Sequence, residues 1–225
     1  MMTSIIVPVL NEEAVIERSL TALKCVDGEK ELIVVDGGST DSTADRARQL
    51  ATKLLTAACG RGSQMHAGAM AASGDVLWFV HADTLPPSHA AREIGRALTD
   101  PAVVGGSFRL VFDGDGRSAR QLTAIYPWLR LLGLSYGDAA IFVRRNAYEA
   151  AGGFRPYPLF EDLDLIRRLK RQGRFVGLDC CLTTSSRRFE NRNFAAVWAN
   201  WIALQILYWM GISPHLLARW YKHVR

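Results

Sequence analysis

The first hundred residues alternate between two hydrophobic patterns. Four short apolar runs rich in β-branched residues are typical of buried strands and lie at residues 3–9, 31–36, 53–56 and 75–80. The segments between them repeat their apolar residues at helical spacing. Regular alternation of strand and helix indicates a parallel sheet with right-handed crossovers. We therefore predict an α/β fold with a mostly parallel central sheet flanked by helices.

The rest of the chain is expected to extend this fold and to add a helical appendage. Further strands are predicted at residues 103–112 and 139–143, and further helices at residues 121–132 and 162–172. An almost wholly apolar stretch follows at residues 194–212. We predict one α/β domain over residues 1–185 and a C-terminal helical segment over residues 186–225.

Carboxylates directly follow two of the apolar strands. The second strand ends in Asp36 and leads into a Gly37-Gly38 turn, and the fourth leads into His81 and Asp83. Parallel sheets bind ligands at the carboxyl edge of their strands, so these turns are candidate ligand sites. Asp36 could accept hydrogen bonds from a base or ribose while Gly37 lets the ligand approach closely. The alternative is that Asp36 only caps its own turn.

The turn after the first strand limits the kind of nucleotide site. It reads Asn11-Glu12-Glu13, and Asn11 is expected to cap the following helix. This is not the glycine-rich fingerprint of dinucleotide-binding folds, and the chain has no Walker Gly-Lys-Ser/Thr sequence. We therefore expect phosphate groups to be held by a metal ion and by cationic side chains.

Composition and charge narrow the class of protein only slightly. A chain of 225 residues with 49% hydrophobic and 22% charged residues is ordinary for a folded domain. A net charge of +5 fits an anionic ligand or an anionic membrane surface without requiring nucleic acid. The N-terminus lacks the pattern of a signal peptide, which favours a cytoplasmic protein. Reduced thiols are expected at all four cysteines, Cys25, Cys59, Cys180 and Cys181.

His81 and Asp83 are candidate metal ligands. On an extended segment, side chains two residues apart point the same way. One imidazole and one carboxylate suit Mn²⁺ better than Mg²⁺, which prefers oxygen ligands. Such an ion would neutralise a diphosphate and stabilise its departure as a leaving group. The alternative is an Asp-Thr turn beside a hydrogen-bonded histidine.

Four stretches of sequence, in this order, resemble the family 2 glycosyltransferases. They are Ile5-Ile6-Val7-Pro8 with Asn11-Glu12, the run from Val34 to Asp41, the strand leading to Asp83, and Glu161-Asp162. The resemblance extends from the N-terminus to about Gly173. It implies the nucleotide-diphospho-sugar transferase (GT-A) fold, a nucleotide-diphospho-sugar donor and a divalent cofactor, Mn²⁺ or Mg²⁺.

The resemblance also implies roles for individual residues. Asp83, with His81 beside it, would hold the metal, and Asp162, with Glu161 beside it, would be the catalytic base. The alternative for the acid pair is a helix N-terminus with acids favoured by the helix dipole. Asp138 precedes a predicted strand and could face the acceptor, or could simply be a turn residue. The candidate donor-binding residues are Pro8, Leu10, Glu12, Val35, Asp36, Gly37, Arg61, Ala82, Arg187 and Arg188.

These roles predict an in-line displacement at the anomeric carbon of the donor sugar. Asp162 would take the proton of the attacking hydroxyl, and the charges of Glu161 and Asp164 would raise the pKa of Asp162. One base without a covalent nucleophile predicts inversion. The cations Arg187 and Arg188, with the metal, would stabilise the departing nucleoside diphosphate.

The sequence departs from the family pattern in two places. His81 stands where the family commonly has the first Asp of its D-x-D motif. Gln205, Tyr208 and Trp209 have the spacing of the Q-x-x-R-W motif of processive synthases, but tyrosine replaces arginine. We therefore expect the transfer of single sugars.

The apolar stretch at residues 194–212 leaves three possibilities open. It carries Trp198, Trp201, Tyr208 and Trp209, and basic residues flank it on both sides. It is marginal in length for a membrane span and suits a helix in the bilayer interface, a homodimer contact or packing on the domain. A membrane-facing helix would place the protein at the inner face of the membrane and would suit a lipid or apolar acceptor.

Two other functional classes remain. A sugar-phosphate nucleotidyltransferase shares the broad architecture, but usually needs a glycine-rich basic loop where this chain has Asn11-Glu12-Glu13. A nucleotide-sugar-binding or membrane scaffold module without catalysis is favoured by His81 and disfavoured by Asp83 and Asp162. An Asp162→Asn variant should separate the enzyme from the scaffold.

Overall fold

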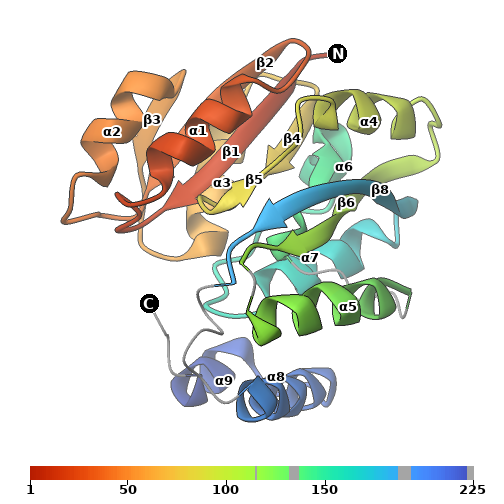
Figure 1. Cartoon of the computed structure of the whole chain (residues 1–225). Helices are drawn as coiled ribbons and strands as arrows, with labels where there is room; N and C mark the ends of the chain where they lie inside the picture. The colour runs from red at the N-terminus through yellow and green to blue at the C-terminus, as the bar shows by residue number, and fades with distance from the viewer. Residues whose placement is uncertain (115, 132–136, 187–193, 222–225) are drawn as a thin grey trace.

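The computed structural model describes residues 1–114, 116–131, 137–186 and 194–221 (Figure 1). The strands in these residues are β1 (Thr3–Val9), β2 (Lys30–Asp36), β3 (Lys53–Thr56), β4 (Val76–Phe79), β5 (Thr84–Leu85), β6 (Val103–Phe112), β7 (Phe142–Arg144) and β8 (Arg174–Thr184). The helices are α1 (Ile16–Lys24), α2 (Thr43–Leu50), α3 (Arg61–Ala71), α4 (Ala90–Ala97), α5 (Arg117–Leu131), α6 (Arg145–Ala150), α7 (Glu161–Leu169), α8 (Phe194–Trp209) and α9 (Pro214–Trp220), with a 3₁₀ turn, η1, at Gly137–Ala139.

The strands form one sheet in the order β3-β2-β1-β4-β7-β6-β8-β5. The first four neighbours pair in parallel, β7 runs antiparallel to both β4 and β6, and β8 is parallel to β6. The predicted mostly parallel α/β sheet with C-terminal helices is therefore confirmed. Because β7 runs opposite to both of its neighbours, β4 and β6 point the same way. Strands β6 and β8 therefore end at the same edge of the sheet as β1, β2 and β4.

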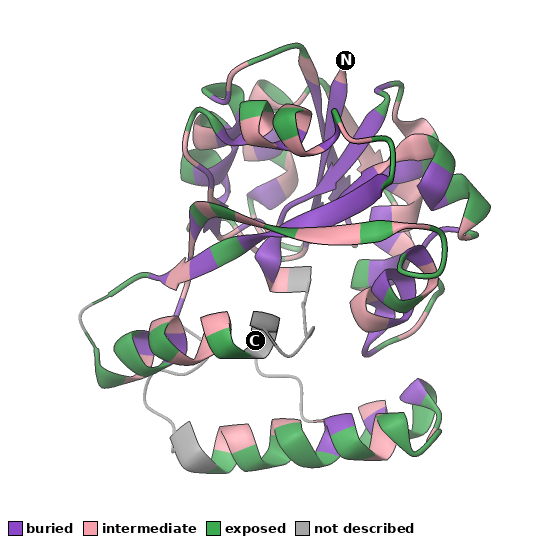
Figure 2. Cartoon of the chain, turned by 90° about the vertical axis from the view of Figure 1, so that its right-hand side faces the viewer, coloured by how far each residue is buried: buried purple, intermediate pink, exposed green. Residues whose placement is uncertain are grey.

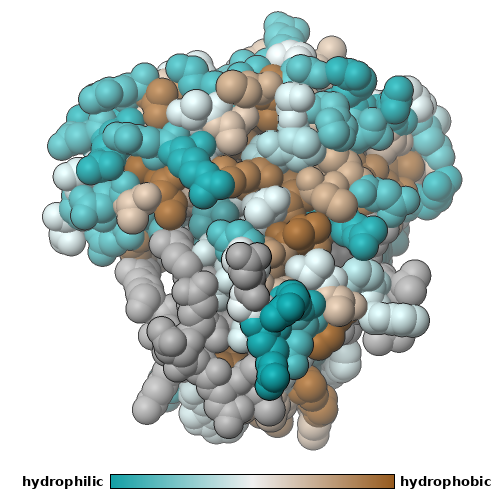
Figure 3. All heavy atoms as spheres, in the orientation of Figure 1, coloured by the Kyte–Doolittle hydropathy of each residue, from teal (hydrophilic) through white to brown (hydrophobic). Residues whose placement is uncertain are grey.

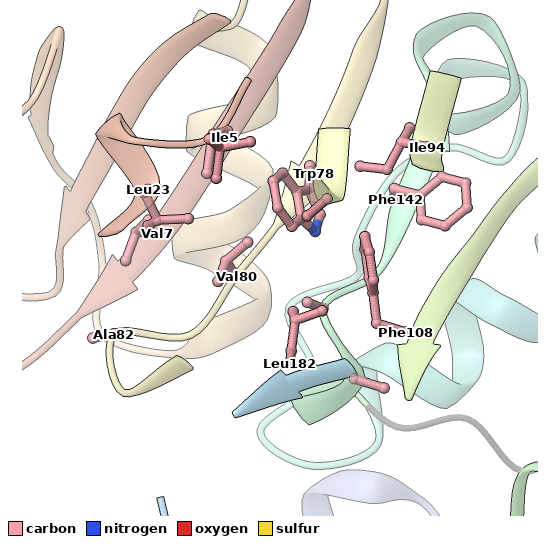
Figure 4. Packing of buried hydrophobic residues seen from close by; sticks show 14 of the residues in the cluster. Ile5, Val7, Leu23, Trp78, Val80, Ala82, Ile94, Phe108, Phe142 and Leu182 are labelled. Carbon is pink, nitrogen blue, oxygen red and sulfur yellow. The ribbon is translucent and has the colours of Figure 1, made fainter. Parts of the chain in front are cut away.

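Helices cover the sheet on both faces. Side chains alternate along β1, so that Ile5 and Val7 join a core with α1, α2, α4 and α5, while Ile6 joins a core with α3, α6 and α7. In the first core, shown in Figure 4, the rings of Trp78 and Phe108 lie 5.4 Å apart. A sheet buried on both faces needs apolar residues at successive positions, which explains the continuous runs in the sequence.

The second half of the chain differs from the prediction in detail. The helix expected from residue 121 begins at Arg117, because its polar first turn carries little apolar signal. The strand expected at residues 139–143 is only Phe142–Arg144, because Ala140 has a φ of 50°, which interrupts extended backbone. Strands β5 and β8 were not predicted. Most of β8 is exposed or half-buried, so it lacks an apolar run.

Glu31 is a buried carboxylate near the start of β2. It accepts hydrogen bonds from Ser4 Oγ at 2.6 Å and Ser73 N at 2.5 Å, and Lys53 Nζ lies 2.9 Å away. Burial raises the pKa of Glu31, but these partners outweigh it and lower the pKa from 4.5 to about 2. A carboxyl whose folded pKa is depressed stabilises the fold above its unfolded pKa and loses that contribution as the pH falls toward 2.

We therefore expect Glu31→Gln to destabilise the fold by on the order of 3 kcal/mol at pH 7. The difference from wild type should shrink as the pH falls below about 4.5, where the unfolded glutamate becomes protonated. Urea unfolding at pH 7 and pH 3.5 would measure both effects. The exposed neighbour Glu29, changed to Gln, is the matched control. An equal loss at both pH values would contradict this account.

Candidate active site at the carboxyl edge of the sheet

The turns after β1 and β2 lie side by side. Val9 is the register partner of Asp36, and Gly37 N donates to Val9 O at 2.9 Å. The loops that follow are joined by two further hydrogen bonds, from Asn11 N to Ser39 Oγ and from Thr40 N to Asn11 Oδ1, both 2.9 Å. The turns after β1 and β2 therefore meet at one edge of the sheet.

Asn11 does not cap a helix, so that prediction is wrong. Helix α1 begins five residues later, at Ile16, with Val15 at its N-cap. Asn11 instead has a left-handed φ of 53°, and its amide oxygen accepts a hydrogen bond from Thr40 N in the neighbouring loop. The loop-to-loop bond uses the oxygen that a cap would need.

Asp36 holds its own turn together. Its buried carboxylate accepts hydrogen bonds from Ser39 Oγ at 2.5 Å, from Ser39 N at 3.1 Å and from Gly38 N at 3.3 Å. This is the capping alternative that the sequence left open. Each carboxylate oxygen has more than one acceptor site, so a nucleoside contact by Asp36 stays a prediction.

Gln64 was missed by the sequence analysis. Its buried Nε2 donates to Val9 O and to Val35 O, both at 2.8 Å, which ties the start of α3 to the ends of β1 and β2. A Cβ on Gly37 would lie 3.1 Å from the Gln64 amide, which explains a glycine there. The available signal was one long polar residue in a helix rich in small residues. Of the other predicted donor residues here, Pro8 and Val35 are buried in strands and Leu10 and Glu12 are half-buried.

His81 and Asp83 lie in a tight turn, not on the extended segment that we expected. Thr84 N donates to His81 O at 3.1 Å and closes the turn. The chain must reverse here because β5 pairs antiparallel with β8, where Thr84 Oγ1 lies 3.3 Å from Thr184 Oγ1. Ala82, between the two candidate ligands, is buried.

Asp138 lies against His81. The antiparallel pairing of β4 and β7 continues beyond the strands, with Phe79 N donating to Ile141 O at 2.8 Å. It leaves Asp138 Oδ1 3.5 Å from His81 Nδ1, and Tyr126 Oη donates to Asp138 Oδ2 at 3.4 Å. Asp138 was predicted to face the acceptor. That role stays a prediction, and its neighbour is a candidate metal ligand.

Among the described residues, no three His, Cys, Asp or Glu side chains gather closely enough to hold a metal ion by themselves. Mg²⁺ is often bound by one or two carboxylates, with substrate phosphates and water completing the coordination. The metal roles of His81 and Asp83 stay predictions, and two candidate ligands suit a divalent ion that a diphosphate helps to bind better than a permanent structural metal.

The acid pair opens α7 and lies against the first turn of α3. A Cβ on Gly62 would lie 2.6 Å from Arg155 O and 3.3 Å from Glu161 Cβ. Burial, followed by the charge of Asp162, raises the pKa of Glu161 to about 7, while Arg61 lowers this pKa. Asp138 also raises the pKa of Glu161, so the acid pair and the residues beside His81 share one electrostatic environment.

Asp164 belongs to a different cluster. Its carboxylate is 2.6 Å from Arg168 and 3.4 Å from Arg155. The effect that we expected Asp164 to have on the pKa of Asp162 stays a prediction. Asp162 itself is half-buried and lies at the start of the helix.

Arg187 and Arg188 lie outside the described residues. The chain reaches them from the end of β8, where Thr184 pairs with the strand that follows the His81 turn. Ser186, the last described residue before them, donates from its N to Asp113 Oδ1 at 2.8 Å.

The family model "Glycosyl transferase family 2" matches residues 4–160 of this chain. The matched segment covers more than half of the 225 residues, and the protein belongs to this family. The resemblance found in the sequence is thereby confirmed.

Curated relatives align over parts of the chain. Glucosyl-3-phosphoglycerate synthase of Mycobacterium tuberculosis is 37% identical over 95 residues, which cover 37% of this chain and 29% of that protein. Undecaprenyl-phosphate 4-deoxy-4-formamido-L-arabinose transferase of Proteus mirabilis is 32% identical over 154 residues, covering 63% and 47%. The chain spans less than half the length of each of these relatives.

Solved structures share the fold. The M. tuberculosis synthase, crystallised with Mn²⁺, UDP and glucosyl-3-phosphoglycerate, has a TM-score of 0.65 at 24% identity, covering 94% of this chain and 80% of that one. TarS of Staphylococcus aureus, crystallised with UDP-GlcNAc, has a TM-score of 0.65 at 19% identity, covering 87% and 61%. This likeness confirms the predicted GT-A fold.

Proposed function

We propose that this protein is an inverting glycosyltransferase that moves a single sugar from a nucleotide-diphospho-sugar to an acceptor hydroxyl with a divalent metal. One observation carries the proposal. The turns after β1 and β2, the His81–Thr84 turn after β4, and the start of α3 all lie at one edge of the sheet, and Glu161 packs against that start of α3. Family membership supports the same activity.

The donor would lie across the carboxyl ends of β1, β2 and β4. The nucleoside would contact the paired turns around Pro8, Leu10, Glu12, Val35, Asp36 and Gly37. Asp83, with His81, would hold Mn²⁺ or Mg²⁺ against the diphosphate, next to the backbone of Ala82. Arg61, Arg187 and Arg188 would add positive charge. The UDP found in two structural neighbours makes uridine the first nucleoside to test.

The protein's own part in the reaction is to place the acceptor and take its proton. The acceptor oxygen forms a bond to the anomeric carbon as the bond from that carbon to the diphosphate oxygen breaks. The hydroxyl proton passes to Asp162, and the electron pair leaves with the nucleoside diphosphate. The metal, when bound, would supply charge stabilisation to that leaving group. A single displacement inverts the anomeric centre.

Glu161 supports this step from the interior. Its packing against Gly62 fixes the start of α7 and therefore the position of Asp162. The raised pKa of Glu161 keeps the charge of the acid pair low near neutral pH, so that a buried carboxyl group can lie next to the half-buried Asp162. Asp162, the more exposed of the two, is the group that can reach the acceptor.

A cytoplasmic location fits this proposal. From the sequence we expect all four cysteines to be reduced thiols, as in a reducing compartment.

Gly62→Ala should disturb the acid pair. The new methyl group would overlap Arg155 O, and a shift of about 1 Å at a catalytic group can cost about 10²-fold in rate. We expect donor turnover to fall by about tenfold to a hundredfold. Gly95→Ala in α4 is the matched control, because its Cβ would meet nothing within 4 Å. Equal turnover in the two variants would contradict the proposed packing.

Donor cleavage by water tests the proposed function without knowledge of the acceptor. UDP-glucose and UDP-GlcNAc would be incubated with the protein and Mn²⁺, and NMR would record the anomer of the sugar that first appears. We expect metal-dependent release of UDP and inversion at the anomeric carbon. Retention would contradict the mechanism, and the absence of both cleavage and donor binding would favour a scaffold without catalysis.

A further inference from the structure

Helix α8 shows an unusual distribution of polar and apolar residues. Its inner face packs Trp201, Leu204 and Tyr208 against Phe160, whose ring stacks on Tyr208 at 4.8 Å. The inner face also buries the polar side chain of Gln205. Surface helices normally bury their apolar face and expose their polar one. The outer face of α8 therefore needs an explanation of its own.

That outer face is apolar, and the neighbouring α9 also exposes large apolar side chains. In Figure 2, exposed residues follow α8 along the end of the molecule away from the sheet, and Figure 3 shows hydrophobic atoms at this end. We define the outer face by six large apolar side chains that each expose between 47% and 73% of their surface, namely Ile202, Ile206, Trp209, Met210, Leu216 and Trp220. An exposed apolar face of this kind marks a contact with a partner or a membrane.

The charge of this part of the chain has one sign. Residues 191–225 contain no Asp or Glu, and their sequence carries four cationic residues, Arg192, Arg219, Lys222 and Arg225, of which Arg219 lies among the described residues and is exposed. An anionic lipid surface attracts basic residues that lie close to it. Tryptophan is enriched at the level of lipid headgroups, and the outer face carries two, Trp209 and Trp220.

We propose that the outer face of α8 and α9 binds the interfacial region of an anionic lipid bilayer. The helix would lie on the bilayer, because 16 residues at about 1.5 Å each give roughly 24 Å, less than the roughly 30 Å of a hydrocarbon core. Within the described residues, no helix is long and apolar enough to cross a membrane.

A second copy of the chain suits this face less well. In a two-fold dimer the same patch lies on both sides of the interface, so two copies of residues 191–225, each cationic and without an acidic residue, would be brought together. Like charges brought together oppose association, whereas anionic headgroups would neutralise them. The charge pattern thus favours the bilayer.

Membrane binding would place the acid pair close to the bilayer. Phe160, held by the inner face of α8, directly precedes Glu161 and has a left-handed φ of 62°. The same helix would therefore contact lipid on one side and the entrance to α7 on the other. Resting on the proposed function, this arrangement suits an acceptor that is presented from the membrane surface.

Vesicle binding tests the surface directly and needs neither donor nor acceptor. The protein would be sedimented with vesicles of phosphatidylcholine alone, or with phosphatidylglycerol at about three parts in ten. The wild type should bind the anionic vesicles, and added salt should weaken binding. A double variant, Trp209→Glu with Met210→Glu, should bind at least about tenfold less. Met70→Glu is the control, since Met70 is 71% exposed on α3.

Three outcomes would overturn the proposal. The first is that the wild type stays in the supernatant with both kinds of vesicle, and the second is that the double variant binds as well as the Met70→Glu control. The third is that sedimentation velocity without lipid shows a dimer for the wild type and a monomer for the double variant. Because donor cleavage is measured separately, the membrane proposal can fail while the glycosyltransferase proposal stands, and the reverse.

Discussion

Asp162→Asn is expected to lower sugar transfer by about 10²- to 10⁴-fold and to leave donor binding almost unchanged. The asparagine has nearly the same shape but cannot take the proton of an attacking hydroxyl. The loss should appear in kcat and not in the affinity for the nucleotide, because Asp162 acts only as the acceptor attacks. Steady-state cleavage of the donor together with calorimetric donor binding would separate these two quantities.

Asp164→Asn is the matched control for this change. Asp164 lies two residues further along α7, and its carboxylate is bound to Arg168 at 2.6 Å. Its loss should lower thermal stability and leave the rate of the folded protein nearly intact. If Asp162→Asn cleaved the donor at the wild-type rate, Asp162 would not be the base.

Asp83→Ala should abolish the dependence of donor binding on Mn²⁺. With few protein ligands at the site, losing the principal one should weaken the Mn²⁺-dependent affinity for UDP by at least about tenfold to a hundredfold. Electron paramagnetic resonance of Mn²⁺ in the presence of UDP would show the ion bound by the wild type and left in solution by the variant. This readout does not depend on turnover.

His81→Asp is the informative comparison for Asp83. It replaces the imidazole by the carboxylate that the family commonly has at this position, so Mn²⁺ binding should persist. If Asp83→Ala held the ion as well as the wild type does, the metal ligands would have to be sought elsewhere.

Local sequence pattern predicts the half of the sheet that carries the donor turns. Strands β1, β2 and β4 are buried on both faces, so their continuous apolar runs are unambiguous. Strand β8 escapes prediction because most of its residues are exposed or half-buried, and β5 is only two residues long. Strand β5 forms by pairing with β8, and β8 forms by pairing with β6. Pairing between segments far apart in the chain leaves no signal in a short stretch of sequence.

The residues of the site also divide into those that local sequence predicts and those that depend on long-range strand pairing. The carboxylates at strand ends can be found from sequence, because a turn after a buried strand has a fixed place in a parallel sheet. The contact between His81 and Asp138 depends on the antiparallel insertion of β7 between β4 and β6. Similarly, an apolar run predicts α8 as a helix, but only the packing of Tyr208 on Phe160 shows which face is left outward.

We propose above all that the carboxyl edge of the sheet binds a nucleotide diphosphate through a divalent metal. Calorimetric titration of the wild-type protein with a panel of nucleoside diphosphates and nucleotide sugars, with and without Mn²⁺, tests it most directly. We predict that UDP and a UDP-sugar bind, and that binding weakens strongly when the metal is removed. Failure of every member of the panel to bind with either Mn²⁺ or Mg²⁺ would contradict the account.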